Sequence, residues 1–498
     1  MRRTLIRTKI IATAGPASRA AHTLAALLEH GVDCVRLNFS HGTQAEHAEI
    51  IGTVRRIAAE QGISVAIMGD LCGPKIRMGA IADSDRELKA GEHVEIVTAP
   101  THGTAHRFGT NLPELVQQAR SGDRVLIDDG QIRLRVTAQS ADRLICVCEI
   151  GGLLGDHKGI NLPDTSLATC PLTEKDLRDL DFAVQQQLDY VALSFIQRGS
   201  DIQALRSELQ RRGGDQHIIS KIETPQAVQD IESIIAASDL VLVARGDLGV
   251  QMDLAVVPLV QKDIARRCRA AGKPVIIATQ MLQSMVTSPN PTRAEVSDVA
   301  NAILDDADAV MLSAETAIGR HPVEAVEVVQ RVAAETERFL DTRAQRLGEA
   351  ALAGQSAPAG DGRVRHLPNE GTSVREAVAA GAAWLTAALR PAVVCVWTAS
   401  GATARRVSKQ RVPAPILGLT PQSRIAQRLA LYYGVVPLLM NRPASDAQMI
   451  AMLERHALED GWAVAGEVIL IVAGSSAQTG HSSHAIFLHQ VQPAPPDV

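Results

Sequence analysis

Short apolar runs, each followed by a segment with helical periodicity, recur along the first two thirds of the chain. The runs are almost continuous in Val, Ile, Leu and Ala, which is typical of parallel strands buried on both faces. Eight runs have this character, at residues 9–14, 34–39, 65–70, 190–195, 217–223, 240–247, 274–280 and 309–315. Amphipathic helical patterns follow most of them, for example at 174–187, 200–212 and 252–271. The alternation predicts an α/β fold, a closed (β/α)8 or TIM barrel.

The run at 65–70 is followed by a segment with a different pattern of polar and apolar residues. Short stretches of alternating polarity, such as EHVEIV and RLICVCEI, are separated by turn signals that include Asp129-Gly130 and Gly151-Gly152. We therefore expect a small β-barrel lid domain, residues 75–157, inserted after the third strand. The catalytic barrel would then comprise residues 1–74 and 158–345.

The last part of the chain changes character twice. Residues 346–371 are rich in Ala, Gly, Pro and charged residues, which indicates a linker. From Ser373 onward helices and strands alternate again, with strands expected at 393–397, 415–420, 435–440, 468–473 and 485–490. This pattern predicts a C-terminal α/β sandwich domain, residues 372–498.

Composition narrows the functional classes. The 498 residues are enough for about two to four domains. A formal net charge of −5 and 2% aromatic residues give neither the basic excess nor the stacking platforms that nucleic-acid binding requires. The seven cysteines are odd in number and scattered, which suits a reducing cytoplasm. We see neither a secretory signal pattern nor a membrane-spanning apolar run, so we expect a cytoplasmic protein without a membrane partner.

Polar residues collect where the predicted barrel strands end, which is where the active site of such a barrel lies. Alternation along a strand places Arg36, Asn38 and Ser40 on one face, and Lys221 and Glu223 on another. The remaining strand ends contribute Asp70, Arg245-Gly246-Asp247 and Thr279-Gln280. One such group alone is usually a solvated strand end or a turn, but five together favour a functional site.

The chemistry of these residues fits phosphoryl transfer. Glu223 and Asp247 come from neighbouring strands, and paired carboxylates are typical ligands of Mg²⁺. Lys221, Arg36 and Arg77 supply fixed positive charge around the same barrel mouth. A divalent ion and fixed cations are what phosphoryl transfer needs from a protein. Backbone N–H groups that follow Gly246 at the start of a helix can bind a small carboxylate.

The sequence resembles the pyruvate kinase family over nearly its whole length. The resemblance is carried by TKIIATAGPAS (8–18), VRLNFSHG (35–42), DLCGPKIR (70–77), DDGQI (128–132), KGINLP (158–163), ISKIETPQAV (219–228), VARGDLGV (243–250), KPVIIATQML (273–282), PTRAEVSDVANAILDDADAVMLSAETA (291–317) and QRLALYYGV (427–435). It implies transfer of the phosphoryl group of phosphoenolpyruvate to ADP, which gives pyruvate and ATP in glycolysis. It also implies Mg²⁺ or Mn²⁺ as cofactor and a homotetramer.

The resemblance assigns roles to individual residues. Glu223 and Asp247 match the Mg²⁺ ligands, and Lys221 matches the lysine that stabilises the migrating phosphoryl group. Arg36 and Arg77 match arginines on the phosphates. The substrate-binding residues that it implies are Arg36, Lys221, Gly246, Asp247 and Thr279, with Thr279 also near the route of the proton to the enolate carbon. The nucleotide contacts that it implies are Asn38, Phe39, Ser40, His41, Arg77, Asp128 and Lys158, with Lys158 at the return hinge of the lid.

One departure from the family pattern concerns K⁺. Members that require K⁺ typically read Asp-Thr-Lys-Gly-Pro-Glu after the third strand, whereas this chain reads Asp70-Leu71-Cys72-Gly73-Pro74-Lys75. A lysine here resembles the members that need no monovalent cation, because its ammonium can supply the charge that K⁺ brings. We therefore expect K⁺-independent activity. Oxygen ligands for K⁺ are still present at Asn38, Ser40, Asp70 and Leu71, so the alternative stays open.

The C-terminal domain has a candidate effector loop. Thr398, Ser400, Gly401 and Thr403 lie between a predicted strand and helix, where hydroxyls and backbone N–H groups can bind a phosphate. In the family this loop often binds an allosteric sugar phosphate, and a nucleotide effector is the other option; the plain alternative is an ordinary helix cap. Basic residues on the following helix, Arg405, Arg406 and Lys409, either assist such a site or form a solvated face.

Two other functional classes compete with this interpretation. KIETPQAV followed by a strand that ends in Gly-Asp-Leu also resembles metal-dependent aldolases and lyases that stabilise pyruvate enolate. Those enzymes are simple barrels without an inserted domain, so Asp128 and Lys158 argue against them. A non-catalytic regulatory protein on the same scaffold would be favoured by loss of Lys221, Glu223 or Asp247, but all three are present.

Overall fold

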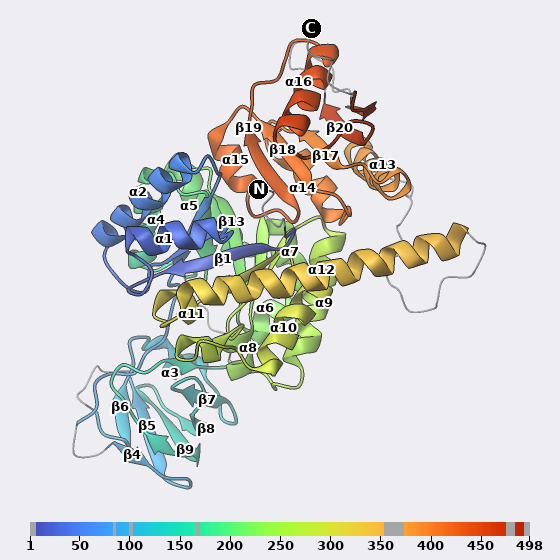
Figure 1. The fold of residues 1–498 in the computed structure, drawn as a ribbon. Coiled ribbons are helices and arrows are strands. Elements are labelled where there is room, and N and C mark those ends of the chain that lie inside the picture. Colours follow the sequence, from blue (N-terminus) through green and yellow to red (C-terminus); the bar gives the residue numbers. More distant parts are fainter. Residues whose placement is uncertain are drawn as a thin grey trace.

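The computed structural model describes residues 6–82, 86–98, 103–165, 170–352, 373–474 and 484–492. Its centre is a closed barrel of eight parallel strands in the order β1-β16-β15-β14-β13-β12-β3-β2 (Figure 1). The strands are β1 (Lys9–Ala14), β2 (Cys34–Asn38), β3 (Ala66–Leu71), β12 (Tyr190–Leu193), β13 (His217–Ile222), β14 (Leu240–Ala244), β15 (Val275–Ala278) and β16 (Ala309–Leu312). All are buried almost throughout, as the apolar runs predict. The expectation of a TIM barrel is confirmed.

Several predicted strands are longer than the observed ones, and two of these continue into helices. The run at 240–247 ends as a strand at Ala244, and α8 (Arg245–Gln251) begins at the next residue. The run at 309–315 likewise ends at Leu312 and gives way to α11 (Ala314–Ala317). Both runs end in mostly polar residues, 245–247 and 313–315, and the sequence pattern alone does not show whether these belong to the strand or to the helix that follows.

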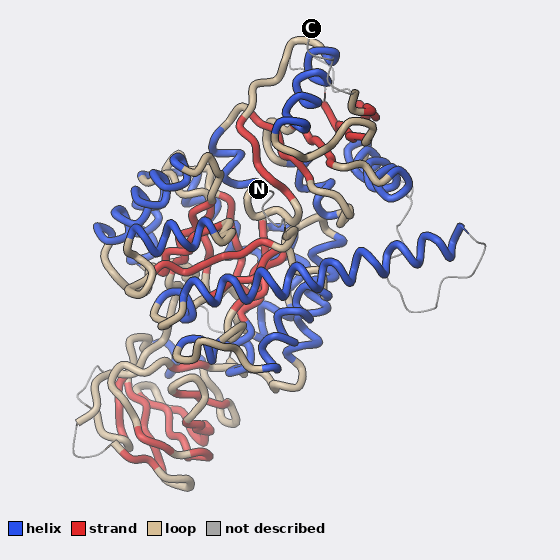
Figure 2. Tube along the Cα trace, in the orientation of Figure 1, coloured by secondary structure: helices blue, strands red, loops and turns tan. Residues whose placement is uncertain are grey.

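Helices surround the barrel on its outside (Figure 2). They are α1 (Ala21–Glu29), α2 (Gln44–Glu60), α4 (Glu174–Gln185), α5 (Gly199–Arg211), α6 (Pro225–Gln229), α7 (Ile231–Ala237), α8, α9 (Val257–Ala270), the 3₁₀ turn η1 (Gln283–Val286), α10 (Arg293–Leu304), α11 and α12 (Pro322–Leu352). Reciprocal capping boxes start α2 at Thr43 and α10 at Thr292. In the described ranges, every helix is too short or too polar to cross a membrane.

The inserted domain is an all-β unit with one short helix. Its elements are β4 (Glu87–Leu88), β5 (His93–Val97), β6 (Arg107–Gly109), α3 (Glu114–Gln118), β7 (Arg124–Ile127), β8 (Ile132–Gln139), β9 (Arg143–Ile150), β10 (Gly152–Leu153) and β11 (Ile160–Asn161). Six strands pair in the order β11-β7-β8-β9-β5-β6, and β10 pairs with β4. Cys146 and Cys148 are buried in the core of this domain.

The C-terminal domain is a five-stranded sheet covered on both faces. It contains α13 (Val374–Leu389), β17 (Val393–Trp397), α14 (Ala402–Lys409), β18 (Ile416–Thr420), α15 (Ser423–Leu429), β19 (Val435–Leu439), α16 (Asp446–Glu459), β20 (Val468–Gly474) and β21 (His484–Gln490). The strand order is β19-β18-β17-β20-β21, with β21 antiparallel. Before this domain, α12 continues to Leu352 through the first residues of the expected linker 346–371, whose remainder lies outside the described residues.

The inserted and C-terminal domains lie at opposite ends of the barrel (Figure 1). The C-terminal domain covers the end where the strands begin. Its Ala430 and Leu431 belong to the apolar cluster inside the barrel, together with Met68, Tyr190 and Met311. The hydroxyl of Tyr190 also donates a hydrogen bond to the carbonyl of Arg428 (2.6 Å). The opposite end, where the strands terminate, therefore stays open for a site beneath the inserted domain.

Candidate active site

Lys221 forms the centre of a buried charge cluster at the C-terminal ends of the strands. Its Nζ lies 2.8 Å from Oε1 of Glu223 and 3.3 Å from Oδ1 of Asp70. It also donates to Oγ of Ser194 (2.8 Å). Burial alone would lower the pKa of Lys221, but the carboxylates of Asp70 and Glu223 outweigh burial and raise it. The ammonium therefore keeps its charge and its position.

Arg36 is the second fixed cation. Its Nε and Nη2 each lie 2.7 Å from Oδ2 of Asp70, and its Nη1 donates to Oγ1 of Thr13 (3.0 Å). Burial alone would raise the pKa of Asp70, but Lys221 and Arg36 together hold it below its ordinary value. Strands β1, β2, β3 and β13 thus meet in one network, as the sequence predicts for Arg36, Asp70 and Lys221.

Glu223 and Asp247 provide the candidate metal ligands. Oε2 of Glu223 accepts a hydrogen bond from the N–H of Phe195 (2.8 Å). Burial raises the pKa of Glu223 to about 7; Lys221 opposes this shift, and the nearby Asp247 adds to it. Two neighbouring carboxylates are a typical pair of ligands for a divalent cation. The described residues contain no cluster of three or more His, Cys, Asp or Glu side chains. Mg²⁺ typically takes one or two protein carboxylates and completes its shell with water and substrate.

Thr279 and Gly246 lie beside these carboxylates. The N–H of Gly246 donates to Oγ1 of Thr279 (2.7 Å), and that hydroxyl donates to the carbonyl of Ala278 (2.6 Å). The N–H of Gly246 is therefore engaged in this structure. The N–H groups that follow it in the first turn of α8 remain available for an anion, because the start of a helix lacks internal acceptors for them.

The candidate nucleotide residues Arg77, Asp128 and Lys158 meet at the hinge of the inserted domain. Nη1 of Arg77 donates to the carbonyl of His157 (3.0 Å), and Nζ of Lys158 lies 2.9 Å from Oδ1 of Asp128. Asp128 adopts a left-handed backbone conformation (φ 53°) and its N–H donates to the carbonyl of Gly159 (3.1 Å). All three side chains are at least partly exposed, so a ligand can reach them.

The turn from Asn38 to His41 contributes less side-chain surface than we expected. The ring of Phe39 is buried against His47 and Phe182, and its carbonyl accepts a hydrogen bond from Lys175 (2.6 Å). Ser40 and His41 are exposed, and Oγ of Ser40 lies 3.2 Å from Sγ of Cys72.

The candidate K⁺ ligands are engaged within the protein. Oδ1 of Asn38 accepts from the N–H of Ser40 (3.1 Å), and the carbonyl of Leu71 accepts from Ser194 (2.8 Å). Asp70 is paired with Arg36, as described above. Lys75 is exposed, and its Cε lies 3.7 Å from the position where a Cβ of Gly159 would stand.

The candidate effector loop has an uncapped helix start. Gly401 precedes α14 in a left-handed conformation (φ 81°), and no side chain caps that helix. Ser400 is exposed, Thr403 is half-buried and Thr398 is buried. Lys409 neither assists this loop nor faces solvent, because its Nζ forms a buried ion pair with Asp308 of the barrel (2.7 Å).

Two residues of the cluster were missed from the sequence. Ser194 accepts from Lys221, and Thr13 accepts from Arg36. Ser194 follows β12 directly, so the rule that strand ends carry the site could have found it. Thr13 is the penultimate residue of β1, so the same rule applies to it.

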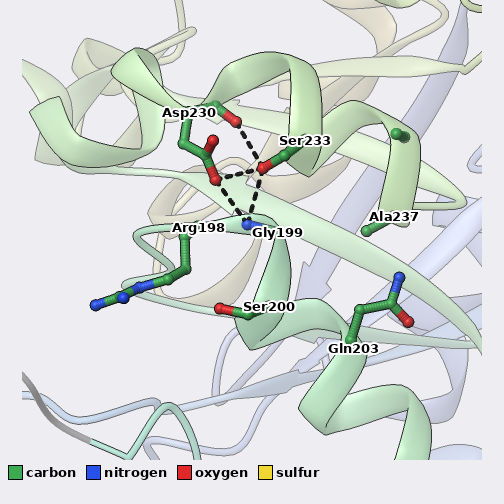
Figure 3. Close-up of a pocket in the computed structure, with 8 residues that line it drawn as sticks. Arg198, Gly199, Ser200, Gln203, Asp230, Ser233 and Ala237 are labelled. Atoms are coloured by element: carbon green, nitrogen blue, oxygen red, sulfur yellow. Dashed lines mark hydrogen bonds between the residues drawn. The ribbon is translucent and has the colours of Figure 1, made fainter.

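A separate surface pocket lies outside this site. It is formed between α5 and α7 and is lined by residues that include Arg198, Gln203 and Ala237 (Figure 3). Part of its polar lining is paired, because the N–H of Gly199 donates to Asp230 (2.9 Å) and Ser233 (3.1 Å). None of the predicted site residues lines it.

Comparisons with known proteins agree with this geometry. The family model described as pyruvate kinase, barrel domain, matches residues 5–326, and the model described as pyruvate kinase, alpha/beta domain, matches residues 376–486. A pyruvate kinase of Agrobacterium vitis is 43% identical over 484 residues, covering 96% of this chain and 95% of the relative. One from Clostridium acetobutylicum is 37% identical and covers 98% and 100%.

A solved structure of a pyruvate kinase has the same fold. The crystal structure of a pyruvate kinase from Cryptosporidium parvum superposes with a TM-score of 0.88 at 33% identity, covering 98% of this chain and 96% of the other. The two-domain match and the relatives of nearly equal length favour this family over a simple aldolase barrel. This chain belongs to the pyruvate kinase family of glycolytic phosphotransferases.

Proposed function

We propose that this chain transfers the phosphoryl group of phosphoenolpyruvate to ADP at the open end of the barrel. The observation that carries the proposal is the position of Lys221 between Glu223 and Asp70, within reach of both and excluded from solvent. A buried ammonium that keeps its charge can stabilise the charge that spreads over the phosphoryl oxygens in the transition state.

The surrounding residues bind and orient the substrate. Arg36, fixed by Asp70 and Thr13, contacts the phosphate, and the first turn of α8 beyond Gly246 binds the substrate carboxylate. Glu223 and Asp247 hold Mg²⁺ or Mn²⁺, which when bound would neutralise charge on the phosphate and the enolate oxygen. The hydroxyl of Thr279 lies beside the carboxylate subsite and holds a proton near the carbon that becomes the methyl group of pyruvate.

The inserted domain acts as a lid over the nucleotide. Arg77, Asp128 and Lys158 lie at its hinge, and Asn38 to His41 form the opposite wall of the nucleotide subsite. Closure would bring both sets onto ADP and exclude water, which would otherwise accept the phosphoryl group.

Four finer properties belong to the same proposal. Activity is independent of K⁺ because Lys75 supplies the positive charge. The loop of Thr398, Ser400, Gly401 and Thr403 binds a phosphorylated effector, either a sugar phosphate or a nucleotide. The chain assembles as a homotetramer in the cytoplasm. The cation requirement, the effector and the tetramer follow from the family resemblance, and the location follows from the scattered cysteines.

The test is pyruvate formation from phosphoenolpyruvate, followed with lactate dehydrogenase, in the presence and absence of ADP and Mg²⁺. We expect formation to require both, and to be lost in Glu223→Gln, which keeps the shape of the side chain but not its charge. Pyruvate release without ADP would mean that the phosphoryl group passes to water, which would contradict the proposed transfer to ADP. Full activity of Glu223→Gln would contradict the assigned metal site.

A further inference from the structure

The turn after β15 has an unusual backbone. Thr279 and Gln280 both adopt left-handed conformations, with φ of 68° and 55°. This region is unfavourable for residues with a Cβ and most unfavourable for a β-branched residue such as Thr279. Such a conformation persists only where surrounding contacts hold it. The same conformation places Oγ1 of Thr279 against the N–H of Gly246 (2.7 Å).

The contacts that hold this turn come from Arg245, the first residue of α8. Its Nη2 donates to the carbonyl of Thr279 (3.0 Å) and to that of Gln280 (3.4 Å). The same nitrogen lies 2.7 Å from Sδ of Met281. One guanidinium group thus contacts three consecutive residues of the turn. Its side chain is 11% exposed, so water competes little for these hydrogen bonds.

Asp298 in turn fixes the guanidinium. Nη1 of Arg245 lies 2.6 Å from Oδ1 and 2.6 Å from Oδ2 of Asp298. Asp298 belongs to α10, which follows the turn in sequence. These contacts therefore connect the outer helix α10, through Asp298 and Arg245, to the hydroxyl of Thr279 beside the substrate subsite. Neither Asp298 nor Arg245 is part of that subsite.

We propose that Arg245 and Asp298 are positioning residues, which hold the left-handed turn and thereby aim the Thr279 hydroxyl at the reacting carbon. The inference rests on the proposed function of Thr279. We call the contacts of Arg245 with Asp298 and with the turn the clamp. Weakening the clamp lets the turn relax toward a favourable backbone conformation and moves Oγ1 of Thr279 away from Gly246. Misplacement of a reacting group by about 1 Å lowers the rate up to about a hundredfold. The nucleotide subsite and the lid hinge do not contact the clamp, so the affinity for ADP should be preserved.

The test uses Asp298→Asn, which keeps the shape of the side chain and removes the charge that fixes Arg245; the side chain of Asp298 is 38% exposed, so the substitution itself is made at a partly solvated position. We expect kcat to fall about ten- to a hundredfold with an unchanged KM for ADP. The control is Asp181→Asn, which removes one of the two carboxylate partners of Arg212 (2.7 Å; the other is Glu208) on the outer helices, and should leave kcat unchanged. Arg245→Lys is the second variant, because a lysine cannot bridge Asp298 and the two carbonyls at once.

A rescue experiment separates positioning from general structure. Glycine adopts a left-handed conformation without the Cβ clash, so Gln280→Gly lowers the need for a clamp. The double variant Asp298→Asn/Gln280→Gly should have a kcat about fivefold higher than Asp298→Asn alone. Wild-type kinetics of both Asp298→Asn and Arg245→Lys, or a loss that Gln280→Gly leaves untouched, would overturn the clamp. If the unmodified protein forms no pyruvate, the proposed function fails and kinetics cannot test the clamp. A crystal structure of Asp298→Asn then tests it. A Thr279 that keeps its left-handed conformation in that structure would refute the clamp.

Discussion

The ammonium of Lys409 lies 2.7 Å from Oδ2 of Asp308, and both side chains are almost completely excluded from solvent. Nη2 of Arg411 lies 3.3 Å from the other carboxylate oxygen, and the N–H of Val275 donates to Oδ2 (2.7 Å). One barrel aspartate therefore balances two cations of the C-terminal domain. Because the pair is buried, losing one partner leaves a charge that water cannot reach.

The first prediction concerns this ion pair. Asp308→Asn should lower the free energy of unfolding by about 3–5 kcal/mol, because Lys409 and Arg411 lose their counter-charge. Urea unfolding followed by tryptophan fluorescence measures it, since Trp384, Trp397 and Trp462 all lie in the C-terminal domain. Adding Lys409→Met should recover part of the loss. Equal stability of Asp308→Asn and the unmodified protein would show that the pair contributes little.

The second prediction concerns the lysine of the active site. Lys221→Met should lower kcat about a hundred- to a thousandfold, which is the usual effect of removing one group that stabilises transition-state charge. Lys262→Met is the control, because Lys262 pairs with Asp305 at the surface, and it should retain activity. Steady-state kinetics under saturating phosphoenolpyruvate and ADP distinguish the two. Retention of a tenth or more of kcat in Lys221→Met would contradict the assigned role.

The third prediction concerns the monovalent cation. Replacing K⁺ by Na⁺ or Tris should change the initial rate by less than about tenfold if, as we propose, the ammonium of Lys75 supplies the positive charge. In Lys75→Glu the rate should come to depend on K⁺, since a carboxylate would need a cation beside it. A fall of about a hundredfold in the unmodified protein without K⁺, equivalent to ~2.7 kcal/mol in activation free energy, would end this idea.

The fourth prediction concerns pH and Asp189, which lies at the start of β12. Burial raises the pKa of Asp189 to about 7, although a hydrogen bond from the N–H of Ile67 (2.8 Å) and the charge of Arg428 oppose the shift. The folded state thus binds this proton more tightly than the unfolded state. Between about pH 4 and 7 the unfolded state binds fewer protons, so the Asp189 contribution makes stability fall as the pH rises.

The matching experiment compares Asp189→Asn with the unmodified protein. An amide carries no charge at any of these pH values, so the contribution of residue 189 to stability no longer depends on pH. The stability of the variant relative to the unmodified protein should therefore rise from pH 5 to 7 and level off above pH 7. Urea midpoints across this range give the difference. A constant difference would mean that Asp189 is ionised in the folded protein throughout.

The barrel and its charged end could be predicted from the sequence because both follow from local rules. Parallel strands give apolar runs, and alternation puts Lys221 and Glu223 on one face of β13. The rule that strand ends carry the site then brings Arg36 and Asp70 to them. These inferences need no knowledge of which helix packs where.

Other features depend on contacts between distant parts of the chain, which no local pattern encodes. Arg245 looks like part of a strand but begins α8 and points to Asp298, fifty-three residues later. Phe39 lies in a motif that suggests ligand contact, yet its ring packs into the core. Lys409 has the pattern of a solvated helix face, and only the docking of the C-terminal domain explains its burial.

The insertion of Leu431 into the start of the barrel has a consequence for biosynthesis. The last barrel strand ends at Leu312, so the ribosome completes all eight strands well before it adds the residue that fills their open base. Until then Met68, Tyr190 and Met311 in the nascent chain lack an apolar partner from the C-terminal domain. Chaperones that recognise exposed apolar surface should bind at this stage and dissociate once translation has passed the docking segment.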